Sequence, residues 1–223
     1  MNIELPNESS MHLLKESEAS KDQLVEEEKT FLASIPTKKG QKRFITGRVA
    51  ARHALEKLKV ESNNPLLKGE GGEPLWPDGI VGSISHSTIT QSKGFAVALT
   101  AKAPPFTVAG IDIENLSRNL TQPIERKICS PSELEWVNGT GFSGRKTRIL
   151  TLFSAKETIY KALYPIVKRY ISFREVELSW HAELNFFKVQ YTGELSGSDL
   201  EIPKVRVHSQ QQGELTITYA ISQ

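Results

Sequence analysis

A five-residue segment, GIDIE at residues 110–114, places the strongest constraint on how this chain can fold. Its isoleucines alternate with Asp112 and Glu114, and a period of two is typical of a strand with one apolar and one polar side. Both carboxylates therefore lie on the same side of the strand. The segment predicts a sheet that buries the isoleucines and presents two acids to a polar site.

A second charged segment has the spacing of a helix, which we expect to run from Arg145 to Tyr164 and to stop at Pro165. Glu157 and Lys161 lie four residues apart in it, so they share one face. Such a pair is common on exposed helices, and acids at strand ends usually bind nothing. If the two segments meet, however, three carboxylates converge, and a small set of hard oxygen ligands suits Mg²⁺.

Two further groups could recognise an anion. Arg48 and Arg52 are one turn apart on a predicted helix, although such a pair is most often a solvated face. Ser83, Ser85 and His86 follow Gly82 in a segment rich in serine and glycine. They predict a phosphate-binding loop, or a turn that His86 simply caps.

The remaining pattern mixes helices and strands, which gives an α+β fold. Helices are expected over 21–35, over an apolar stripe from Phe44 to Leu58, and from Pro131, where Ser130 and Glu133 form a capping signal. The expected strands are 94–100, 107–114, 176–180, 184–191, 204–208 and 214–221. Residues 61–79 form a long connection rich in glycine and proline.

Three regions follow from this pattern. Residues 1–20 have few apolar anchors and are expected to be a flexible arm. The segment Ala101–Pro105 predicts a boundary, because two prolines interrupt a strand. We therefore divide the chain into the arm, an N-terminal subdomain over 21–103 and a C-terminal subdomain over 104–223.

Composition narrows the classes of function. The net charge of +2 does not call for a nucleic-acid partner. No stretch has the length of a membrane span, and the polar segment Met1–Ser10 does not resemble a signal peptide, so we expect a cytoplasmic protein. The single cysteine, Cys129, excludes an internal disulfide and matches no paired zinc spacing.

Four segments together resemble the 4'-phosphopantetheinyl transferase superfamily, in the two-domain group that activates surfactin and enterobactin synthetases. They are GRVAARHAL at 47–55, WPDGIVGSISH at 76–86, GIDIE at 110–114 and FSAKETIYK at 153–161. Their order and spacing match those of the family. The Trp-Pro pair and the Ser130–Glu133 segment make the enterobactin-type branch the more similar one.

The resemblance implies two similar α/β subdomains related by a pseudo-twofold axis, with coenzyme A in the cleft between them and a monomeric enzyme. The activity it implies is transfer of phosphopantetheine from coenzyme A to a serine of an apo carrier protein, which releases 3',5'-ADP. The residue roles it implies are Mg²⁺ ligands at Asp112, Glu114 and Glu157; contacts to the nucleotide phosphates from Arg48, Arg52, Ser85 and His86; Lys161 as a partner of the diphosphate; and Lys156 as a lesser anion contact. Glu157, directly or through water, is the implied base. A carboxylate beside Mg²⁺ is ordinarily a weak base, so a metal-bound water is the alternative.

Three positions depart from the family pattern. Ser87 stands where many relatives have a cysteine, although others have serine. Arg43 replaces a common acid, and Glu73 replaces a basic residue, so contact with the diphosphate is not expected from position 73. Two other functions remain open: a non-catalytic module that binds coenzyme A or a carrier, and a Mg²⁺-dependent hydrolase of nucleotide diphosphates. A nucleic-acid binder fits less well, because no aromatic residues are interleaved with the arginines.

Overall fold

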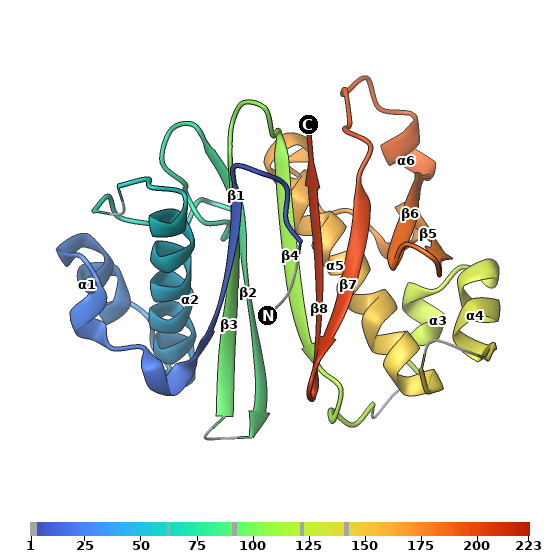
Figure 1. The fold of residues 1–223 in the computed structure, drawn as a ribbon, viewed down its shortest axis with the longest axis horizontal. Coiled ribbons are helices and arrows are strands. Elements are labelled where there is room, and N and C mark those ends of the chain that lie inside the picture. Colours follow the sequence, from blue (N-terminus) through green and yellow to red (C-terminus); the bar gives the residue numbers. More distant parts are fainter. Residues whose placement is uncertain (1–3, 62, 91–92, 121–122, 141–142) are drawn as a thin grey trace.

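The structure is a computed structural model that describes residues 4–61, 63–90, 93–120, 123–140 and 143–223. It confirms an α+β architecture in which two antiparallel sheets lie next to each other and a long helix covers each of them (Figure 1). The two sheets meet where strand β2 (Ile80–Thr90) packs against strand β4 (Val108–Asn115).

The N-terminal half is a three-stranded sheet with the order β1–β3–β2. Strand β3 (Lys93–Lys102) is central, and helix α2 (Lys38–Lys57) packs on it through small apolar residues that allow a close approach. Helix α1 (Glu26–Ala33) lies beyond α2, after two single-turn 3₁₀ helices at Glu16–Glu18 and Lys21–Gln23. Figure 1 shows this half in blue and green.

The expectation of a flexible arm over residues 1–20 is wrong for its second half. Residues Ser9–Lys15 form strand β1, which pairs antiparallel with β3 along its whole length. Met11 and Leu14 are buried. An edge strand needs few apolar residues of its own when its backbone groups bond to a neighbour, so its mostly polar sequence gave little sign of it.

The C-terminal half is a five-stranded antiparallel sheet with the order β4–β8–β7–β6–β5. Its other strands are β5 (Val176–His181), β6 (Phe186–Tyr191), β7 (Arg206–Gln212) and β8 (Leu215–Ser222). Helix α5 (Arg145–Val167) crosses β4 and β8. The shorter helices are α3 (Glu125–Ile128), α4 (Pro131–Asn138), α6 (Gly193–Ser196) and a 3₁₀ turn at Phe173–Glu175.

The alternation in GIDIE has the predicted effect. Ile111 and Ile113 are fully buried in an apolar cluster with residues of β3 and β8, such as Leu99 and Ile217. Asp112 and Glu114 point to the other side, where α5 runs. The connection between β3 and β4 contains the expected boundary, although the division into subdomains stays a prediction.

One helix end matches its prediction and another does not. Helix α4 begins at Pro131, and the Ser130 hydroxyl accepts a hydrogen bond from the Glu133 N–H while the Glu133 carboxylate accepts one from Ser130 N–H. Helix α5 continues through Pro165, because a proline in the last turn removes only one hydrogen bond. In the part of the chain that is described, no helix combines the length and apolar character of a membrane span.

Gly110 allows α5 to approach β4 closely. A Cβ atom at this position would lie 2.2 Å from the Thr158 carbonyl oxygen of α5. We therefore expect Gly110→Ala to push the helix away and to lower the free energy of unfolding by about 1–3 kcal/mol, measured by urea denaturation. Gly144→Ala is the control, because a Cβ there meets no atom within 4 Å. Equal effects of the two substitutions would contradict this account.

Candidate active site

Asp112 is the centre of a polar cluster that joins the two halves. Its side chain is buried, with the residue 4% exposed. The Oδ1 atom accepts hydrogen bonds from Ser85 Oγ at 2.8 Å and from Lys161 Nζ at 2.6 Å, and Oδ2 accepts one from Ser154 Oγ at 2.8 Å. A buried carboxylate is stable only with such partners, so Asp112 holds β2, β4 and α5 together.

Lys161 links the same elements a second time. Its ammonium also donates to Ser85 Oγ at 2.8 Å, so that one cation lies between a strand of the N-terminal half and a carboxylate of the C-terminal half. Its side chain remains 26% exposed, and the residue lines the cavity described below.

The other two carboxylates lie in the electrostatic field of Asp112. Burial, and then the nearby charge of Asp112, raise the pKa of Glu114 to about 7, although Arg118 at 3.2 Å opposes this shift. The same two causes raise the pKa of Glu157. Neighbouring acids that disfavour one another's ionised form mark a place where a bound cation would be stabilised.

These carboxylates fit a magnesium ion in their chemistry, since Mg²⁺ takes hard oxygen ligands and usually a small number from the protein. Among the described residues no group of three histidine, cysteine or acidic side chains is already arranged around a common point. The Lys161 ammonium instead neutralises Asp112. The assignment of Asp112, Glu114 and Glu157 as metal ligands therefore stays a prediction.

The predicted phosphate-binding loop at 82–86 is a strand. Ser83, Ser85 and His86 lie on β2, whose period of two sends Ser85 and His86 to opposite sides. The His86 ring packs on α2, because a Cβ at Gly47 would lie 2.5 Å from His86 Nε2. That nitrogen is buried and has no hydrogen-bond partner among the described residues.

Cations surround the His86 ring. Burial is the largest cause that lowers the pKa of His86, to about 3, and the positive charges of Arg43 and Lys161 add to it. The imidazole is therefore neutral, with an unused nitrogen in a basic environment. The positive charges of Arg43, Lys161 and Arg48 near the ring would favour an anion in this region.

The two arginines of α2 are buried, which differs from the exposed heads expected from the sequence. Arg52 forms an ion pair with Glu28 of α1. The Glu28 carboxylate also accepts a hydrogen bond from the Leu66 N–H at 2.8 Å. Arg48 lies over the Phe44 ring and donates to the Leu67 carbonyl at 3.3 Å. Burial lowers the pKa of Arg48 to about 10. Arg52 thus anchors α1, and the structure does not bring it to the carboxylate cluster.

Lys156 is not part of the site. Its side chain is 1% exposed, and its ammonium lies at 2.7–2.8 Å from the Glu133 carboxylate and the carbonyl oxygens of Ile128, Phe173 and Val176. These acceptors use all three of its N–H donors. The expectation that Lys156 contacts an anion is therefore wrong; it ties α5 to α4 and to the start of β5.

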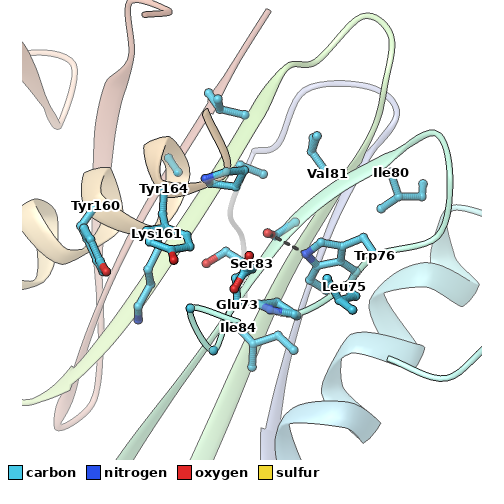
Figure 2. Close-up of a pocket in the computed structure, with 18 of the residues that line it drawn as sticks. Glu73, Leu75, Trp76, Ile80, Val81, Ser83, Ile84, Tyr160, Lys161 and Tyr164 are labelled. Carbon is cyan, nitrogen blue, oxygen red and sulfur yellow. Dashed lines mark hydrogen bonds between the residues drawn. The ribbon is translucent and has the colours of Figure 1, made fainter. Parts of the chain in front are cut away.

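A cavity of about 450 Å³ adjoins the cluster and lies between the two halves (Figure 2). The wall from the N-terminal half contains Trp76, whose Nε1 donates to the Gly82 carbonyl at 2.8 Å. The opposite wall is the α5 face that bears Tyr160, Lys161 and Tyr164. The sequence did not assign roles to Ser154 or Tyr164, yet both follow from helical spacing, at three residues from Glu157 and from Lys161.

Comparison with known proteins identifies the family of both halves. The model for the 4'-phosphopantetheinyl transferase N-terminal domain matches residues 26–101, and that for the 4'-phosphopantetheinyl transferase superfamily matches residues 109–220. A solved structure, holo-[acyl-carrier-protein] synthase from Neisseria meningitidis, has a TM-score of 0.42 at 23% identity and covers 52% of this chain and 97% of its own.

Curated relatives are similar over part of their length. The 4'-phosphopantetheinyl transferase Svp of Streptomyces mobaraensis is 39% identical over 139 residues, 61% of this chain and 53% of the relative. Npt of Nocardia iowensis is 34% identical over 68% of this chain and 64% of its own. Enterobactin synthase component D of Escherichia coli K12 is 33% identical over 55% and 56%. The chain thus spans about half to two thirds of the length of these relatives.

The environment of His86 predicts a pH dependence of stability. The pKa of His86 is about 3 in the folded protein, whereas its ordinary value is 6.5. Between these two pH values His86 therefore binds a proton in the unfolded chain and not in the folded protein. The contribution of His86 is present above pH 6.5 and is lost as the pH falls toward 3. In urea denaturation at pH 7.5 and 5, we expect His86→Gln to lose less stability on acidification than the unaltered protein. The exposed residue His181 provides the control, His181→Gln, and an equal pH dependence of all three proteins would contradict the account.

Proposed function

Because the chain belongs to the 4'-phosphopantetheinyl transferase superfamily, we propose that it transfers the 4'-phosphopantetheine group of coenzyme A to a serine of an apo carrier protein and releases 3',5'-ADP. The observation that carries the proposal is the cluster around Asp112, in which Ser85 and Lys161 meet a carboxylate at the end of a cavity. Phosphoryl transfer needs alignment and charge neutralisation more than covalent help from the protein.

Coenzyme A would lie across the cleft. The basic surroundings of His86, with Arg48 nearby, support contact with the phosphates of the nucleotide. The partly exposed side chain of Lys161, which lines the cavity, supports contact with the diphosphate. Arg52, which is held by Glu28, would act on the nucleotide only through the position of α2.

Asp112, Glu114 and Glu157 would hold the magnesium ion. When bound, Mg²⁺ neutralises the diphosphate and stabilises the charge that develops on the leaving group. The raised pKa values of Glu114 and Glu157 support this assignment, because a cation removes the cost of placing their charges together.

Glu157 would accept the proton of the carrier serine. The serine oxygen forms a bond to the phosphorus that bears pantetheine, and the bond from that phosphorus to 3',5'-ADP breaks. A carboxylate with a raised pKa is a better base than an ordinary one. Lys161, which is one turn from Glu157, would hold the diphosphate in line for this displacement.

Several further features belong to the same proposal. The carrier is an acyl, peptidyl or aryl carrier protein, and the protein acts as a monomer in the cytoplasm. The modest net charge of +2 supports a role without nucleic acid. The enterobactin-type relatives support a siderophore or another secondary-metabolite pathway.

Mass spectrometry of the carrier tests this function. We expect incubation with coenzyme A, Mg²⁺ and a panel of apo carriers to add one phosphopantetheine to at least one carrier, and removal of the metal with EDTA to abolish the addition. A carrier with its acceptor serine replaced by alanine is the control. Release of 3',5'-ADP without a carrier would indicate a hydrolase instead, and binding without any mass gain would indicate a non-catalytic module.

Glu157→Gln tests the assigned base and ligand. Loss of a general base typically lowers the rate 10²–10⁴-fold, so we expect kcat for carrier modification to fall by about that factor. The folded state should persist, since the amide has the same shape. Glu27→Gln, at an exposed acid on α1, should leave the rate unchanged. Full activity of Glu157→Gln would remove Glu157 from the mechanism.

A further inference from the structure

A group of buried hydroxyls lies where α5 crosses β4 and β8 (Figure 1). Three of these side chains come from one face of α5, and two come from one side of β8. All are completely buried: Thr151, Ser154, Thr158, Thr216 and Thr218. Helices usually pack on sheets through apolar side chains, so five hydroxyls in this interface indicate a role other than packing.

The strand register places the two hydroxyls of β8 beside the acids of β4. Asp112 pairs directly with Thr218, and Glu114 pairs with Thr216. Side chains of residues that face each other across two strands lie on the same side of the sheet. The buried hydroxyls therefore form the inner wall of the cluster around Asp112.

Three of the hydroxyls form a hydrogen-bonded chain that ends on Asp112. Ser154 Oγ lies 2.8 Å from Asp112 Oδ2 and 2.8 Å from Thr218 Oγ1. Thr158 Oγ1 lies 2.7 Å from Thr218 Oγ1 and 3.0 Å from the Thr218 carbonyl oxygen. We define Thr158, Thr218 and Ser154 as the hydroxyl chain. It connects α5 and β8 to a carboxylate of β4.

The direction of each hydrogen bond in the chain follows from its end. An ionised carboxylate only accepts, so the single hydroxyl proton of Ser154 is donated to Asp112. Thr218 must then donate to Ser154, and Thr158 must donate to Thr218. Every O–H dipole of the chain therefore points toward Asp112, and aligned hydrogen bonds in a buried environment strengthen one another.

The chain holds Asp112 from the side opposite the cleft. Its Oδ2 atom accepts from Ser154, while Oδ1 accepts from Ser85 and Lys161. The last torsion of an aspartate side chain has a broad energy minimum, so a carboxylate bound only to Lys161 could turn with the lysine. A second, buried hydrogen bond fixes the plane of the carboxylate and keeps Oδ1 directed toward Ser85 and Lys161.

We propose that Ser154, Thr218 and Thr158 are positioning residues that hold the Asp112 carboxylate in place for the reaction. This inference rests on the proposed function, in which Lys161 contacts the diphosphate and Asp112 binds the metal. When Lys161 turns to the diphosphate, the hydroxyl chain keeps Asp112 where it was. The three hydroxyls act only through Asp112 and touch neither substrate nor metal.

Thr218→Val tests the chain, because valine keeps the shape of threonine and removes its donor. A neutral hydrogen bond contributes a factor of about two to ten. We therefore expect kcat for carrier modification to fall by about that factor, with KM for the carrier unchanged. The Kd of Mn²⁺, as a probe for Mg²⁺, should rise similarly in electron paramagnetic resonance titrations of protein saturated with coenzyme A and lacking a carrier. Thr218→Ser, which retains the hydroxyl, should restore both values.

Ser154→Ala is a second test at the other end of the chain. It removes the hydrogen bond to Asp112 itself, and bonds to charged groups are the stronger ones. We expect it to lower kcat and to weaken Mn²⁺ binding more than Thr218→Val does. An effect of Ser154→Ala on neither quantity would contradict the proposal.

The matched control is Thr151→Val, the same substitution at an equally buried position of α5. The Thr151 hydroxyl lies 3.4 Å from that of Thr216 and is outside the chain. This variant should leave kcat and the Kd of Mn²⁺ unchanged, and both valine variants should have similar midpoints in urea denaturation. Equal effects of the two valine substitutions on kcat and Mn²⁺ binding, or no recovery in Thr218→Ser, would overturn the positioning role. Absence of carrier modification by the unaltered protein would instead overturn the proposed function.

Discussion

The structure depends on one buried charge. Asp112 lies in the interior on the polar side of β4, and an unpartnered carboxylate there would cost several kcal/mol. Its oxygens are satisfied by Ser85 of β2, and by Ser154 and Lys161 of α5. The relative positions of these three elements are therefore fixed by the requirement to compensate one charge. The same requirement creates the functional site, because it gathers polar groups of both halves at the end of the cavity.

Neighbouring residues of α5 have opposite roles because successive helical positions face different directions. Lys156 turns into the C-terminal half and is enclosed by Glu133 and backbone carbonyls. Glu157 lies close enough to Asp112 for the charge of Asp112 to raise its pKa. Both residues occur in one short motif, so the motif combines a structural anchor with a site residue.

Local patterns predicted the elements that local chemistry determines. The alternation around Asp112 was sufficient to predict strand β4, and the capping signal before Pro131 was sufficient to predict the start of α4. Strand period and helix capping both depend on only a few neighbouring residues. Long-range contacts decided the rest. Strand β1 depends on pairing with β3, and Arg52 is buried because Glu28 lies opposite it. The sequence around His86 looked like a loop, since glycine and serine are tolerated in a strand whose neighbours complete its packing.

The central claim is that the cluster around Asp112 receives the diphosphate of coenzyme A. A crystal structure of the protein with coenzyme A and Mg²⁺ tests it most directly. We expect the diphosphate to lie within hydrogen-bond distance of Lys161, with the metal held by Asp112, Glu114 and Glu157. Two results would contradict this claim. Coenzyme A could bind outside the cleft between β2 and α5, or Lys161 could keep its ion pair with Asp112 and make no contact with the diphosphate.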